Sequence, residues 1–161
     1  MRKKLYLISA LLCLLGLLWN CTSSVDKADV LLSHARECME IHPDSALYLL
    51  QQITHPDKLN GRQQADYAFL LTQARDKNYL DSLQSDSLIK IAIDYYESHN
   101  DKVKAGKASF YYGIMLSYQD KSTEAMNAYL NAQILLEGTQ EHKLQGLSLI
   151  HISEPTRHSL I

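Results

Sequence analysis

The side chains able to support catalysis or metal binding are scattered along this chain of 161 residues, which has seven histidines, three cysteines and 18 acidic residues. His34 falls on the apolar face of a predicted helix, where a packed histidine is expected. His42, His55, His99 and His142 fall at helix ends or in turns, where histidines are usually solvated. No two of them have the spacing of metal ligands on one helix, and the sequence holds no Gly-rich phosphate loop or nucleophile elbow. We therefore expect no catalytic residues, no cofactor and no metal.

The N-terminal segment has the pattern of an export signal. Arg2, Lys3 and Lys4 precede an apolar run from Leu5 to Trp19, which is shorter than the roughly 20 residues that span a bilayer as a helix. We predict a signal peptide over residues 1–20, and a short uncleaved anchor is the alternative. The mature chain is expected to leave the cytoplasm.

The residues that follow this run resemble the lipobox of bacterial lipoproteins, with Leu18-Trp19-Asn20 directly before Cys21. The resemblance implies that Cys21 becomes the acylated N-terminus, with more than one acyl chain and hence stable membrane anchoring. Trp19 and Asn20 depart from the family, which has small residues there. The alternative is ordinary cleavage further on, with Cys21 lost or left as a free thiol. Residues 21–25 are expected to form a linker.

Charge argues against a nucleic-acid partner. Residues 21–146 carry 12 basic and 17 acidic side chains, a net charge of about −5. They contain no basic stripe of the kind that nucleic acid requires. Only Cys38 remains besides Cys21, so no disulfide framework is possible in this region.

Apolar residues recur at helical spacing, and no segment alternates with the period of two that a half-buried strand needs. An all-α fold follows. Helices are predicted over residues 26–41, 45–53, 61–76, 87–98, 103–118 and 122–136, with another starting at 139–146; they pair as hairpins of about 26–53, 61–98 and 103–136. The residues expected to cap or open these helices are Asp44, Asn60 or Gly61, Ser85 or Asp86, and Asn100 or Asp101.

Small and aromatic residues in the third hairpin are spaced for close helix packing. Gly113 and Ala125 are twelve residues apart, far enough for one helix to end, turn and return. Tyr129 and Ala132 continue the inner face of the second helix in steps of four and three. With Tyr112, these residues are predicted to pack the repeat.

This spacing resembles a tetratricopeptide repeat (TPR). Residues 26–146 are similar to the N-terminal part of TPR lipoproteins of Gram-negative bacteria, with Pro43-Asp44-Ser45-Ala46-Leu47 and Leu71-Thr72-Gln73-Ala74 typical of them. Ser109 stands where a Trp is usual, and Asp120 where a turn glycine is usual. The resemblance implies an antiparallel helix-hairpin array, a TPR-like α-solenoid, whose first helices line a concave groove. The groove positions that it implies in the third repeat are Lys107, Phe110, Ile114 and Ser117.

Two functions are compatible with this resemblance. The first is a non-catalytic interaction scaffold, exported and lipid-anchored, that binds a peptide or protein partner in its groove. The alternative is the extracytoplasmic sensory region of a truncated membrane-spanning regulator. Either one would face the periplasm or the cell surface.

The C-terminal residues have an unusual pattern. The run from Leu147 to Arg157 looks like an in-frame translation of an adapter used to prepare sequencing libraries. We therefore expect residues 147–161 to be an artefact, the helix that starts at residue 139 to be interrupted at 147, and the gene to continue beyond Gly146. The alternative is a natural polar tail closed by Pro155.

Overall fold

The structure is a computed structural model that describes residues 22–80 and 85–153, with side chains from Lys27 onward. All regular structure within these ranges is helical, which confirms the all-α prediction. The predicted signal over 1–20, the lipidation candidate Cys21 and residues 154–161 lie outside the described residues. The helices are α2 (Thr22–Cys38), α3 (Pro43–Gln51), the short 3-10 helix η1 (Pro56–Lys58), α4 (Gly61–Lys77), α5 (Asp86–Ser98), α6 (Lys102–Tyr118), α7 (Ser122–Leu136) and α8 (His142–Ser153).

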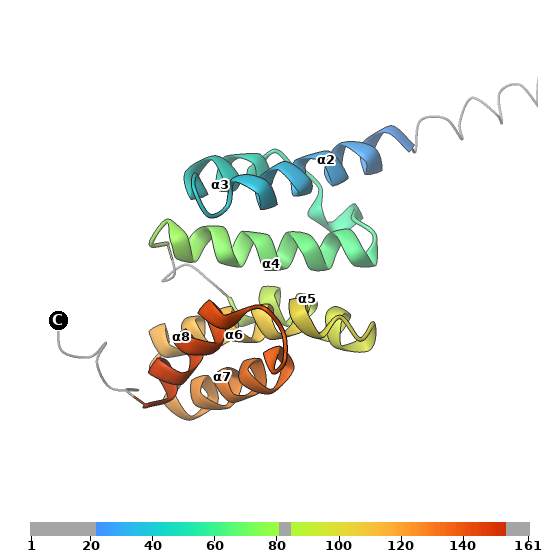
Figure 1. Ribbon diagram of the computed structural model, residues 1–161. Coiled ribbons are helices and arrows are strands. Elements are labelled where there is room, and N and C mark those ends of the chain that lie inside the picture. The colour runs from blue at the N-terminus through green and yellow to red at the C-terminus, as the bar shows by residue number, and fades with distance from the viewer. Residues whose placement is uncertain (1–21, 81–84, 154–161) are drawn as a thin grey trace, which may run out of the picture.

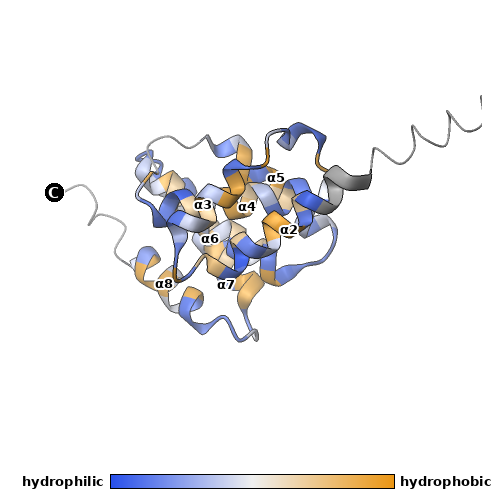
Figure 2. Ribbon diagram, turned by 90° about the horizontal axis from the view of Figure 1, so that it is seen from above, coloured by the Kyte–Doolittle hydropathy of each residue, from blue (hydrophilic) through white to orange (hydrophobic). Residues whose placement is uncertain are grey.

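The helices form a stacked array of hairpins (Figure 1). Within the hairpins α2 packs on α3, α4 on α5 and α6 on α7, and α8 packs on the last pair. The first helices of successive hairpins, α2, α4, α6 and α8, also contact one another in that order. Viewed from above, the connections are mostly hydrophilic, and hydrophobic and hydrophilic residues alternate along the helices (Figure 2). This arrangement gives the array one continuous face made of first helices.

Several helix starts are fixed by local hydrogen bonds, as the sequence predicts. Asn60 caps α4 by accepting from the Gln63 backbone N–H, and the Gln63 side chain accepts in return from the Asn60 N–H. Ser85 caps α5, and Asp101 caps α6 by accepting from the Lys104 N–H. Such caps satisfy backbone donors that have no partner inside the helix.

Helix α3 starts two residues earlier than predicted. Its N-cap is His42, which makes no side-chain capping bond, and Pro43 is the first helical residue. Proline suits this position because its φ is preset and it has no N–H to satisfy. Asp44 therefore lies in the first turn, where a negative charge interacts favourably with the helix dipole, rather than at the cap.

Two further boundaries correct the sequence-based prediction. Helix α2 begins at Thr22, so residues 22–25 belong to the helix and not to a linker; they contain no Pro or Gly that would stop it. Helix α8 continues through residues 147–153 instead of being interrupted at 147. Ser148 is fully buried, and Leu147 and Ile152 pack against the core. These positions share one helical face, which explains the continuation.

The predicted repeat-packing residues lie at the crossing of α6 and α7. Gly113, Ala125, Tyr129 and Ala132 are buried, and Tyr112 is half-buried against the core. A Cβ atom on Gly113 would lie 2.6 Å from the ring of Tyr129, so this crossing requires glycine. The small side chains thus allow the close approach predicted from their spacing.

Both departures from the repeat pattern have structural explanations. Ser109 is buried, and its hydroxyl accepts a hydrogen bond from the Asn131 side chain of α7 at 3.1 Å. Asp120 takes the left-handed conformation, φ 58°, that a turn glycine would take. Aspartate tolerates this conformation better than most residues, so the turn after α6 forms without glycine.

Candidate functional site: the groove along the first helices

A cavity of about 650 Å³ runs along the first helices and defines a groove. It combines side chains from the end of α2 and the turn after it with side chains from α4, α6 and α8. Its lining residues on the part of the chain up to Gly146 are Arg36, Met39, Glu40, Asp66, Phe69, Leu70, Gln73, Asp76, Lys77, Lys104, Lys107, Phe110, Tyr111, Ile114, Glu141, Lys143 and Leu144.

The floor of the groove is apolar and firmly packed. Phe69 and Tyr111 meet edge to face with ring centroids 6.0 Å apart, and Phe110 and Tyr111 do so at 5.5 Å. All three rings are at least nine-tenths buried. The rings hold one another in place through these edge-to-face contacts, so the floor is a preformed surface.

A buried carboxylate, Asp66, organises one part of the wall. Its side chain is only 2% exposed, yet Arg36 of α2 approaches it at 3.1 Å, Lys104 of α6 at 3.2 Å and Arg62 of α4 at 3.4 Å. The Tyr96 hydroxyl of α5 donates to it at 2.7 Å. A charge buried this deeply needs such partners, and here they come from four helices.

Tyr96 is held in its neutral, proton-donating form by the same surroundings. Burial is the main cause that raises its pKa well above the usual value, and the hydrogen bond to Asp66 adds to it. The Lys104 amino group lies 5.2 Å from the centroid of the Tyr96 ring. The phenol therefore donates to Asp66 throughout the physiological pH range.

A second carboxylate, Glu40, joins three helices at the edge of the groove. Lys77 of α4 contacts it at 3.1 Å and Gln73 donates to it at 3.2 Å. Lys143 of α8 lies 3.9 Å away, so this pair reaches across the groove from the first hairpin to the last helix. The Glu40 and Lys143 side chains are both exposed, and exposed ion pairs of this kind contribute little to stability.

Three of the four residues implied by the family resemblance line this groove: Lys107, Phe110 and Ile114. Lys107 is paired with Glu141 at 2.7 Å, and Phe110 is only 3% exposed, so it supports the floor rather than offering much contact surface. Ile114 is half-buried. The fourth, Ser117, lines a smaller neighbouring cavity and donates to the Gly113 carbonyl at 3.0 Å.

Sequence reasoning missed the charged residues that organise the walls, Arg36, Glu40, Asp66 and Lys104. One signal was present for Asp66, because it interrupts the apolar face formed by Ala65, Ala68 and Phe69. A carboxylate in such a stripe must be paired when the helix is buried. Its partners belong to other helices, and nothing local in the sequence names them.

The described part of the chain contains no group of three or more His, Cys, Asp or Glu side chains placed to hold a metal ion. None of the helices within residues 22–80 and 85–153 has the length and apolar character needed to cross a membrane.

Comparison with known proteins adds no family assignment. No family model matches the chain, and no significant match was found among curated proteins or among solved structures.

Proposed function

We propose that this chain is a non-catalytic scaffold whose groove binds an extended peptide or a segment of a partner protein. The observation that carries the proposal is the groove itself, a cavity of about 650 Å³ with a packed aromatic floor and charged walls. Grooves of this size and composition suit side chains of an extended or helical segment. Because the floor is preformed, a ligand loses little free energy in ordering it.

The charges favour a partner segment with acidic side chains. Five Lys and Arg residues line the groove against four Asp and Glu residues, although the whole chain has a net charge of −2. Asp66 and Glu40 are each shared by two of these cations. The oxygens of both carboxylates are thus used several times over, whereas the guanidinium and ammonium groups retain free N–H donors. Acidic side chains of a ligand would accept from these donors.

The proposal includes export and anchoring. A signal over residues 1–20 and lipidation of Cys21 would place the array on the periplasmic side of a membrane or at the cell surface. Helix α2 starts at Thr22, directly after Cys21. The array would then begin at the anchored residue with no long tether, and α2 would separate Cys21 from the groove residues Arg36 and Glu40.

The test is selection of peptides on the full chain from a random displayed library, followed by affinity measurements with one labelled acidic peptide from the selected pool. Aspartate and glutamate should be enriched in that pool. The double variant Lys77→Gln and Lys143→Gln should weaken binding about tenfold, since it removes two groove cations.

The matched control is the double variant Lys102→Gln and Lys121→Gln, which makes the same change of charge outside the groove. It should leave the affinity nearly unchanged. Equal weakening by both pairs would show that only net charge matters, and failure to select any peptide would contradict the proposed function.

A further inference from the structure

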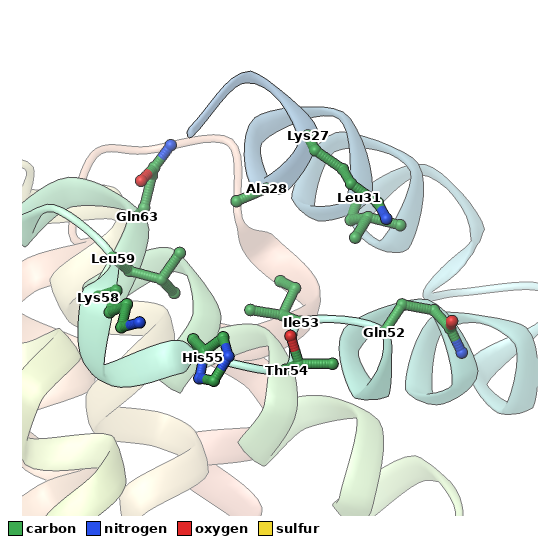
Figure 3. A pocket seen from close by; sticks show the side chains of 10 residues that line it. All are labelled: Lys27, Ala28, Leu31, Gln52, Ile53, Thr54, His55, Lys58, Leu59 and Gln63. Atoms are coloured by element: carbon green, nitrogen blue, oxygen red, sulfur yellow. The ribbon is translucent and has the colours of Figure 1, made fainter. Parts of the chain in front are cut away.

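A second cavity, of about 260 Å³, lies outside the groove at the opposite end of the first hairpin. It is enclosed by α2, by the connection between α3 and α4, and by the first turn of α4 (Figure 3). The ten lining residues are Lys27, Ala28, Leu31, Gln52, Ile53, Thr54, His55, Lys58, Leu59 and Gln63. None of them takes part in the groove.

The base of this cavity is apolar. Ala28 and Ile53 are buried, at 6% and 9% exposure, and Leu31 and Leu59 are half-buried. Figure 3 shows these four side chains in the space between α2 and the connection. A hydrocarbon chain placed there would leave water for an apolar environment, at about 0.8 kcal/mol per CH₂ group.

The rim is polar and cationic. The rim is formed by Lys27, His55, Lys58, Thr54 and Gln52, and among the lining side chains that the structure describes none is Asp or Glu. In Figure 3 Lys58 lies at one end of the cavity and Lys27 at the other. The Lys27 side chain extends along Leu31, which lies four residues later in the sequence and on the same face of α2.

The two lysines differ from those of the groove in their pairing. Lys77, Lys104, Lys107 and Lys143 each lie within 4 Å of a carboxylate. Neither Lys27 nor Lys58 has such an ion pair among the side chains that the structure describes. The cavity therefore presents two positive charges over an apolar base.

We propose that this cavity binds a small amphiphilic carboxylate, of the kind formed by a short fatty acid. The carboxylate lies at the end of the cavity where Lys58 stands, with Thr54 and His55 available as further hydrogen-bond partners, and Lys27 adds a second positive charge at the other end. The short chain covers Ala28, Leu31, Ile53 and Leu59. Ion pairing at a rim next to apolar walls is stronger than in bulk water, because the effective dielectric constant is lower there.

Calorimetric titration of the full chain with octanoate tests this inference, with 1-octanol and acetate as matched probes. Octanoate should bind saturably with one molecule per chain. Octanol lacks the charge and acetate lacks the chain, so both should bind at least about tenfold more weakly. Equal affinity for octanol and octanoate, or no saturable binding of octanoate, would overturn the proposal.

Variants then locate the site. Lys27→Gln and Lys58→Gln change exposed side chains, so folding should be retained. Lys58→Gln should weaken octanoate binding about fivefold, and Lys27→Gln should weaken it less. Lys121→Gln, an exposed lysine at the turn before α7, should leave it unchanged. All the variants keep residues 1–20, so nonspecific uptake of octanoate by that apolar segment would be the same in each. Identical affinities in the three variants would place the ligand elsewhere and contradict the assignment.

Discussion

Gly113 and Tyr129 meet so closely that a Cβ atom on Gly113 would lie 2.6 Å from Cε1 of Tyr129 and 2.9 Å from its Cζ. The Tyr129 side chain is 2% exposed and also packs against Phe110, with ring centroids 5.8 Å apart. The Phe110 ring therefore restricts movement of the Tyr129 ring on that side. This contact fixes the distance between α6 and α7, and through Phe110 it supports the groove floor.

Replacing Gly113 by alanine should destabilise the fold. Overpacking of a filled core costs typically about 1–3 kcal/mol, while alanine recovers about 1 kcal/mol of helix propensity. The urea midpoint should fall, and groove binding should weaken with it. Gly146→Ala is the matched control, since nothing lies within 4 Å of its Cβ position and α8 should become more stable. A stabilised Gly113→Ala variant would show that the crossing is looser than the structure has it.

Asp66→Asn should lower the free energy of unfolding by about 2–3 kcal/mol, because hydrogen bonds to a charged partner are lost inside the fold. Arg36, Arg62 and Lys104 would then lie together without their shared carboxylate. Asp86→Asn removes a single exposed pair with Lys90 on α5 and should have little effect. Urea unfolding measures this free energy for both variants. An equal loss of unfolding free energy in the two would contradict an organising role for Asp66.

Tyr79→Gly should stabilise the chain. Tyr79 has φ 59° directly after α4, a left-handed conformation that costs a residue with a Cβ atom roughly 1–2 kcal/mol. Its side chain is 91% exposed, so little packing is lost. Asp120→Gly serves as comparison, since aspartate tolerates φ 58° better and the gain should be smaller. Thermal unfolding that ranks the two variants in the opposite order would refute this explanation of the turns.

Stability should fall as the pH rises from about 10 to 12. The pKa of Tyr129 is raised to about 12, mainly because the side chain is buried, whereas an unfolded tyrosine titrates near 10. The unfolded chain then loses this proton first, so the stabilisation is complete below pH 10 and is lost towards pH 12, at up to about 1.4 kcal/mol per pH unit. Tyr129→Phe should show a shallower decline in urea titrations across this window. Tyr79→Phe, at an exposed position, should not.

Lipidation is expected at Cys21 alone. Cys21→Ala should abolish incorporation of labelled palmitate in cells, and the chain should no longer partition with membranes through an acyl anchor. Cys38→Ala should retain both properties, because Cys38 is half-buried in the fold and its thiol donates to the Ala35 carbonyl at 3.6 Å. Equal labelling of the wild type and Cys21→Ala would exclude Cys21 as the acylated residue.

The sequence by itself determined the helices and their order, because these depend on residues close together in the chain. Caps such as Asn60 and Asp101, and the spacing of Gly113, Ala125, Tyr129 and Ala132, act over one turn or one hairpin. Helix α3 starts at Pro43 rather than after Asp44, because proline suits the first helical position and competes with Asp44 in setting the helix start. The helix boundaries at the two ends also differ from the prediction, since residues 22–25 and 147–153 are helical. In α8 the continuation follows from Leu147, Ser148 and Ile152, which face the core.

Only the tertiary structure decided the composition of the two cavities. Asp66 pairs with Lys104, 38 residues away, and Glu40 with Lys143 at the far end of the array. The second cavity likewise joins Lys27 of α2 to Lys58 in the connection between α3 and α4. These contacts depend on the angle at which each hairpin packs on the next. That angle is set by the packing of many side chains at once, and no local sequence pattern encodes it.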